Sequence, residues 1–194
     1  MNWLAHLVLA GDEPIARVGQ LAGDFVRGRE IDTLIPELRA AVLAHRALDA
    51  FADAHPAMRA ARARVVGPLR RWAPVLCDVF FDHLLARDFE SLGPGSGLDG
   101  FVDLVHAELL EHLPLLPARL RALLPRLTAE RWLASYADLD GIHLTLRRME
   151  HRLRRPVALA DGVAQLRDQD AGFARDFDQL WAALRARASS PGFA

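Results

Sequence analysis

Aspartate and histidine side chains recur within apolar segments of the first half of the chain, and their types suit metal-assisted chemistry. His45 and Asp49 are four residues apart, so on a helix they share one face. Asp78 and Asp82 repeat this spacing, and His83 follows directly. A carboxylate buried among Leu, Val and Phe is costly unless it is paired or binds a metal. Several such groups from separate segments therefore indicate a shared cation.

Four residues are predicted to hold this cation, a divalent metal: Asp24, His45, Asp82 and His83. Imidazole and carboxylate ligands suit Mn, Fe, Zn or Mg, and a single cysteine excludes a thiolate cage. Such a metal lowers the pKa of a bound water towards neutrality and neutralises charge on a phosphoryl oxygen. The sequence therefore predicts a metal-dependent enzyme that hydrolyses a phosphoester.

Further residues near the predicted ligands could assist the reaction. Asp49 or Asp78 would accept the proton of the attacking water. Arg27 and Arg46 would bind the phosphate, because a guanidinium group can contact two phosphate oxygens at once. His6, which lies in the first predicted helix, is a candidate at the edge of this group.

Structural roles for the same residues are the alternative. His45 and Asp49 could form an ordinary ion pair along one helix, and Asp78 and Asp82 could pair with arginines. The protein would then be a helical binding protein without a metal. A further alternative keeps the metal but changes the substrate to a nucleotide or another small phosphoester.

The composition narrows the class of protein. The 194 residues fit one domain, residues 1–194, and an apolar content of 52% can supply a large core. A net charge of −1, with arginine as every one of the 24 basic residues, argues against general nucleic-acid binding. No stretch reaches the length of a membrane-spanning helix, and the first residues lack the basic leader of a secretory signal. We therefore expect a cytoplasmic protein with no nucleic-acid or membrane partner, and its oligomeric state stays open.

Helical periodicity dominates the chain, and no stretch alternates as a half-buried strand would. The expected fold is all-α, a single compact multi-helix domain. Asn2 is predicted to cap the first helix, and the second is predicted to run to about Gly28 and to carry Asp24. The glycine-rich segment 91–100 is predicted to be a surface loop.

Six segments together resemble the acyl carrier protein phosphodiesterase family, and they keep its order and spacing over most of the chain. They are MNWLAHLVLA at 1–10, GDFVRG at 23–28, HRALDAFADAHPAMR at 45–59, RRWAP at 70–74, DVFFDHLLARDF at 78–89 and LRRMEHRLRRP at 146–156. This family is a distant relative of the HD-domain metal phosphohydrolases. The resemblance therefore implies an HD-domain-like helical core with a C-terminal helical extension.

The resemblance also implies a substrate and a cofactor. The substrate would be holo-acyl carrier protein, and the enzyme would release 4'-phosphopantetheine to leave the apo carrier. The cofactor would be a divalent cation, with Mn favoured and Mg or Fe as alternatives. Asp24, His45, Asp82 and His83 fall on motif positions of the family.

Acyl carrier proteins are acidic, so the resemblance suggests a docking role for arginines in the second half of the chain. The candidates are Arg119, Arg121, Arg147, Arg148, Arg152, Arg154 and Arg155. The alternative is that these arginines lie on solvated helix faces and pair with Asp and Glu.

Overall fold

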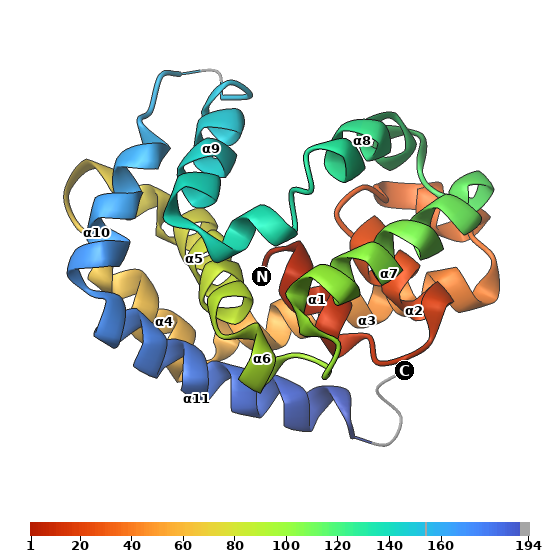
Figure 1. The fold of residues 1–194 in the computed structure, drawn as a ribbon, viewed down its shortest axis with the longest axis horizontal. Coiled ribbons are helices and arrows are strands. Elements are labelled where there is room, and N and C mark those ends of the chain that lie inside the picture. The colour runs from red at the N-terminus through yellow and green to blue at the C-terminus, as the bar shows by residue number, and fades with distance from the viewer. Residues whose placement is uncertain (154, 191–194) are drawn as a thin grey trace.

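The computed structural model describes residues 1–153 and 155–190, and this part of the chain is built from helices without a β-strand (Figure 1). The predicted all-α class is therefore confirmed. The α-helices are α1 (Trp3–Leu9), α2 (Pro14–Ala22), α3 (Pro36–Ala54), α4 (Pro56–Arg64), α5 (Ala73–Arg87), α6 (Phe89–Leu92), α7 (Gly97–Glu111), α8 (Ala118–Ala129), α9 (Leu139–Glu150), α10 (Gly162–Asp168) and α11 (Asp170–Ala188). Short 3₁₀ helices connect them: η1 (Gly28–Thr33), η2 (Gly67–Trp72), η3 (Leu113–Leu115), η4 (Ala134–Ala137) and η5 (Leu159–Asp161).

Helix α5 lies in the interior and contacts α1, α4, α9 and α11. Its sequence is apolar on nearly every side, which is typical of a helix that other helices surround. Asp82 and His83 both lie on this helix and are buried. Their polar atoms must therefore find partners within the protein.

Helices α2 and α3 pack closely, and α1 lies against both α2 and α5. Gly19 permits the close approach, because a Cβ atom there would lie 2.3 Å from the Cβ of Ala41. His45 belongs to the buried stripe of α3, together with Val42 and Leu48. This packing turns the middle of α3 towards α1, so that residues about 40 positions apart in sequence become neighbours.

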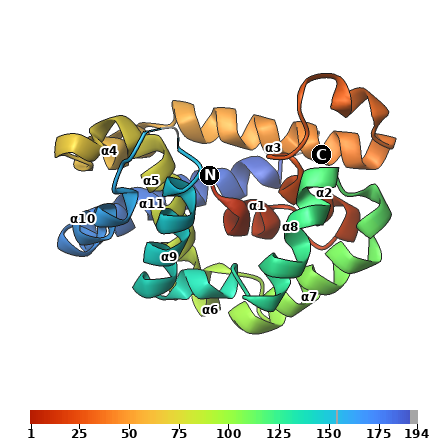
Figure 2. The ribbon, with the colours of Figure 1, turned by 90° about the horizontal axis from the view of Figure 1, so that it is seen from above.

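The C-terminal helix α11 packs on α3, α4 and α5, and its buried side chains belong to the same hydrophobic cluster as those of α1. Figure 2 shows α3 along one side of the molecule with α11 behind it. Helix α11 is thus part of the core. Within residues 1–153 and 155–190, no helix has the length and apolar character needed to cross a membrane.

Three local predictions were wrong. Helix α2 ends at Ala22, so Asp24 lies in the turn that follows it, where the N–H of Phe25 donates to the carbonyl of Ala22. Asn2 precedes α1 but makes no side-chain cap. The predicted loop at 91–100 is short, because α6 and α7 leave just residues 93–96 between them.

Candidate metal centre

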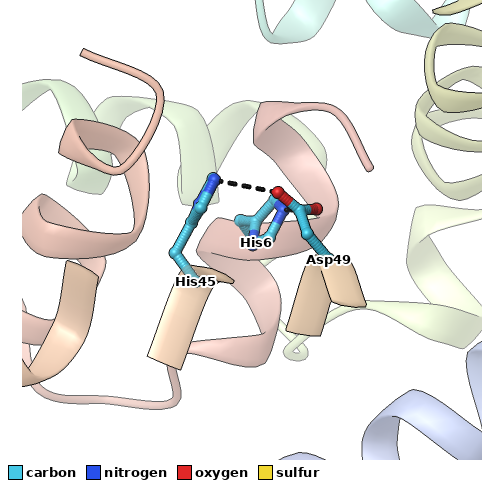
Figure 3. Close-up of side chains that lie close together, drawn as sticks. All are labelled: His6, His45 and Asp49. Carbon is cyan, nitrogen blue, oxygen red and sulfur yellow. Dashed lines mark hydrogen bonds and ion pairs between the residues drawn. The ribbon is translucent and has the colours of Figure 1, made fainter. Parts of the chain in front are cut away.

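Three side chains from two helices converge in one cluster, which we call the His–Asp cluster: His6 of α1 and His45 and Asp49 of α3 (Figure 3). The Nε2 atom of His6 is 3.0 Å from Oδ1 of Asp49, and Nε2 of His45 is 3.2 Å from Oδ2. The two imidazole rings stack with centroids 3.9 Å apart. One ligand atom from each residue lies within 4.8 Å of the others, which is a geometry that can hold a metal ion.

Asp24 lies beside this cluster on its solvent side. Its Oδ1 is 3.5 Å from Nε2 of His45, and its Oδ2 accepts a hydrogen bond of 2.8 Å from Nε1 of Trp3. The side chain of Asp24 is 45% exposed, whereas that of His45 is 3% exposed. Asp24 therefore joins the buried cluster to the surface from which a substrate would approach.

Gly23 allows the turn after α2 to approach His45. A Cβ atom at this position would lie 2.4 Å from Cγ of His45, a distance at which the ring would have to move. The ring thus lies directly against the backbone of the turn that carries Asp24. The absence of a side chain at Gly23 therefore lets Asp24 lie close to His45.

Protonation within the cluster favours a bound cation. Burial lowers the pKa of His6, so the ring is neutral and carries one proton. Nδ1 of His6 lies 3.0 Å from Oε1 of Gln20 and Nε2 lies 3.0 Å from Oδ1 of Asp49, so the one proton can be donated to either oxygen. With the proton on Nδ1, the lone pair of Nε2 would be free for a cation that Oδ1 of Asp49 also binds.

His45 supplies the opposite charge when no metal is bound. Burial lowers the pKa of His45, but hydrogen bonds to Asp24 and Asp49 outweigh this effect and raise it to about 9. Burial would likewise raise the pKa of Asp49, yet hydrogen bonds from His45 and His6 hold it well below its ordinary value. A metal would replace the proton of His45, because a metal-binding imidazole must be neutral.

The α-amino group of Met1 also contacts the cluster. It donates to Oδ1 of Asp49 at 2.8 Å and lies 3.5 Å from Oδ1 of Asp78. Burial lowers its pKa, but the charges of Asp78 and Asp49 raise it to about 10. Asp78 itself has a raised pKa, chiefly because it is buried. The ammonium group of Met1 therefore lies between Asp49 of α3 and Asp78 of α5.

Asp82 was predicted to be a ligand, but the structure gives its carboxylate another partner. Its Oδ2 and Oδ1 accept hydrogen bonds from the backbone N–H groups of Leu4 (2.7 Å) and Ala5 (3.1 Å), and the side chain is fully buried. It thus satisfies the first N–H groups of α1, the role predicted for Asn2. Burial raises the pKa of Asp82 to about 7. Asp82 holds in place the helix that carries His6, and it lies outside the group of candidate ligands.

His83 does not join the cluster either. Its Nδ1 donates to the backbone carbonyl of Tyr136 at 2.8 Å, and the residue lines a separate hollow with Arg87 and Asp170. Successive residues on a helix point about 100° apart, so Asp82 and His83 cannot both face α1. The predicted metal set of four is therefore brought together in part: Asp24 and His45 meet, whereas Asp82 and His83 do not.

The two predicted phosphate-binding arginines, Arg27 and Arg46, are both exposed. Nη2 of Arg46 donates to the carbonyl of Val26 at 3.1 Å and so ties α3 to the segment after Asp24. Arg27 lies in that segment and is exposed, and its backbone N–H donates to Glu30. Arg27 is three residues after Asp24, and Arg46 reaches the same segment through its hydrogen bond to Val26.

Two contributors to the site, Trp3 and Gln20, had no predicted role, and His6 was predicted to be peripheral. Trp3 contacts Asp24, Gln20 contacts His6, and His6 contacts Asp49, and these contacts between distant sequence positions could not be read from the sequence. One local signal was present: Trp3 and His6 are three residues apart, so they share one face of α1.

Comparison with known proteins shows the family of the chain. A family model described as acyl carrier protein phosphodiesterase matches residues 1–184. The chain is similar to the acyl carrier protein phosphodiesterases of Serratia proteamaculans (40% identity over 166 residues, 86% of each chain) and Yersinia enterocolitica (39% over 160 residues, 82% of this chain and 83% of the relative). It is also 35% identical over 189 residues to that of Escherichia coli O157:H7, covering 97% of this chain and 98% of the relative. No solved structure matches it. The resemblance noted in the sequence is confirmed, and the chain belongs to the acyl carrier protein phosphodiesterase family.

Proposed function

We propose that this protein hydrolyses holo-acyl carrier protein to apo carrier and 4'-phosphopantetheine. Water would attack the phosphorus of the diester, the bond from phosphorus to the serine oxygen would break, and that oxygen would take a proton. The single observation that carries the proposal is the convergence of His6, His45 and Asp49 in a chain of this family. Relatives named for this activity match nearly the whole chain.

The proposed metal ligands are His6, His45 and Asp49, with Asp24 completing the set from the exposed side. This set replaces the predicted one, because Asp82 is occupied by the backbone of α1. The donors are nitrogen and oxygen atoms, which supports a divalent ion with Mn favoured and Mg or Fe as alternatives. When bound, such an ion activates water and neutralises charge on the phosphoryl group.

Other residues of the chain would move protons and hold the phosphate. Asp78 is the proposed proton acceptor, because Asp49 is engaged with the two histidines. Partial burial raises the pKa of Asp78, which makes its carboxylate a stronger base than an exposed one. Arg27 and Arg46 are the proposed phosphate contacts, since Arg27 follows Asp24 by three residues and Arg46 donates to the carbonyl of Val26 in the same segment.

The cytoplasmic location, the single domain spanning 1–194 and the HD-domain-like character of the core stay predictions that belong to this proposal. Holo-acyl carrier protein is the proposed partner. The oligomeric state stays open.

The experiment follows the mass of the carrier. Purified protein is incubated with holo-acyl carrier protein and Mn, and we expect the carrier to lose the mass of one phosphopantetheine group. A chelator should stop the reaction, and added Mn should restore it. Asp49→Asn should lower the rate by about 100-fold or more, because it removes a metal ligand. Asp53→Asn is the matched control, since Asp53 lies one turn further along α3 and its side chain is 62% exposed.

Several results would contradict the proposal. An unchanged carrier mass together with turnover of generic phosphodiesters would favour a small phosphoester as the substrate. No metal uptake by the protein would favour the helical binding protein. Equal activity of the Asp49→Asn and Asp53→Asn variants would remove Asp49 from the site.

A further inference from the structure

Four arginines surround a hollow of about 330 Å³ between α8 and α9, which we call the arginine hollow. They are Arg126, Arg147, Arg148 and Arg152. Trp132 lies beneath them and is 6% exposed, and Leu144 adds an apolar side chain that is 49% exposed. The hollow thus offers several cations and one apolar contact at the surface.

The arginine hollow keeps an excess of positive charge. Glu130 pairs with Arg126 at 2.7 Å and also contacts Arg148, while Glu150 pairs with Arg147 at 2.9 Å. Four guanidinium groups therefore meet two carboxylates, which leaves an excess of two positive charges. Because the whole chain has a net charge of −1, this excess is a local feature.

The pairs do not hide the guanidinium groups from an incoming partner. The side chain of Arg147 is 52% exposed, whereas its partner Glu150 is 10% exposed and also accepts a hydrogen bond from the N–H of Ala160. Within residues 1–153 and 155–190, Arg152 forms no ion pair with an acidic side chain. Arg147 and Arg152 can therefore contact carboxylates of another molecule without first losing a buried interaction.

A stack of aromatic rings joins the arginine hollow to the metal centre. The guanidinium of Arg148 lies 4.5 Å from the ring centroid of Trp132. The ring of Trp132 is nearly parallel to that of Trp3, with centroids 6.3 Å apart and an angle of 8°. The indole of Trp3 in turn donates to Asp24. Figure 1 shows α8 and α9 on either side of the N-terminal segment that begins α1. The hollow therefore lies beside the exposed edge of the centre.

This position matters for the proposed reaction. The bond to be cleaved joins phosphorus to a serine of the carrier, so the body of the carrier must lie directly beside the metal centre. A surface that holds the carrier must then be adjacent to Asp24 and carry the opposite charge to its partner. The arginine hollow meets both conditions.

We propose that the arginine hollow docks an acidic, amphipathic helix of the carrier protein and so places the phosphodiester at the metal centre. This inference rests on the proposed function. Carboxylates of the helix pair with Arg147 and Arg152, and an apolar side chain contacts Leu144. An excess of two charges is small for nucleic acid, whose binding depends on many phosphate contacts.

The seven arginines predicted to form a docking face divide accordingly. Arg147, Arg148 and Arg152 line the hollow, and Arg126 joins them. Arg119 lines a different hollow, next to Phe25. Of the remaining three, Arg121 and Arg155 are exposed outside the hollow, and Arg154 lies outside the described residues.

The test is charge reversal with a matched control. The variants are Arg147→Glu, Arg152→Glu and the double variant. The control is Arg175→Glu, an exposed arginine of α11, and this helix runs along the edge of the view opposite α8 and α9 in Figure 1. We expect the KM for holo-carrier to rise about tenfold in the double variant at low salt, with kcat changed by less than about twofold. The difference should shrink as the ionic strength rises, because salt screens exposed charges. Binding of apo carrier should weaken in parallel, and Arg175→Glu should match the unmodified protein.

The outcomes separate this inference from the proposed function. If the unmodified protein does not release phosphopantetheine from holo-carrier, the proposed function fails and the inference with it. If it does, but the double variant and Arg175→Glu have equal KM and equal salt dependence, the docking proposal alone is overturned. A weakened affinity for single-stranded DNA with unchanged carrier binding would also overturn it, since the hollow would then bind nucleic acid.

Discussion

Replacing Asp82 should destabilise the protein and weaken metal binding indirectly. The carboxylate accepts hydrogen bonds from two buried N–H groups, those of Leu4 and Ala5. Asp82→Ala leaves both donors without an acceptor, and each buried unsatisfied donor costs about 1–3 kcal/mol. The expected loss in free energy of unfolding is therefore about 2–6 kcal/mol, a large share of the roughly 5–15 kcal/mol that stabilises a typical protein.

The consequence for the site follows from the length of α1. Seven residues are too few to form a helix without outside support. When Asp82 no longer holds its first turn, α1 should unfold locally and release His6 and Trp3 from the centre. Metal affinity should fall because His6, a proposed ligand, is lost to disorder, although Asp82 is not among the proposed ligands.

The assay compares urea unfolding with metal titration for Asp82→Ala, Asp82→Asn and the unmodified protein. The amide oxygen of the Asn side chain can accept one of the two hydrogen bonds, so Asp82→Asn should lose about half as much stability as Asp82→Ala. Metal affinity should fall in the same order as stability. If Asp82→Asn kept its full stability but bound no metal, Asp82 would be a ligand and the reasoning would be refuted.

Three further perturbations address the centre itself. Metal affinity should rise with pH up to about 9, and binding should release about one proton, because the raised pKa of His45 keeps the ring protonated below that pH until the metal displaces the proton. Calorimetry in buffers of different ionisation enthalpy measures this release. A metal affinity that does not change with pH would contradict the prediction. Gly23→Ala should weaken metal binding by about tenfold, because its Cβ would displace the ring of His45. The control is Gly95→Ala, which should bind metal normally because a Cβ there meets no atom within 4 Å. Equal metal affinities of the two variants would show that metal binding tolerates the displacement of the His45 ring. Trp3→Phe keeps an aromatic ring but removes the hydrogen-bond donor to Asp24, so metal affinity should fall several-fold with little change in the urea midpoint. A loss of stability as large as the loss of metal-binding free energy would instead assign Trp3 a purely structural role.

The order and chemistry of the residues predicted much of the architecture. Apolar residues at helical spacing, divided by prolines, indicated the all-α fold, because local periodicity reports which face of a helix is buried. The apolar surroundings of Asp82 and His83 correctly indicated burial on α5. Burial, however, does not reveal the partner, and a carboxylate can be satisfied by a backbone N–H as well as by a cation.

The ligand set of the candidate centre shows where local information ends. His45 and Asp49 were grouped from their spacing alone, because both lie on α3. His6 joins them through the packing of α1 beside α2 and α3, which depends on contacts between residues 39 or more positions apart.

The sequence by itself therefore determined the helical class, the family and the types of side chain available for a metal. The tertiary structure alone decided which of them meet. Asp82 and His83 are adjacent in sequence yet face different neighbours, because consecutive side chains on a helix point in different directions. Asp82 faces the first turn of α1, His83 faces Tyr136, and His6 is brought to Asp49 by the packing of two separate helices.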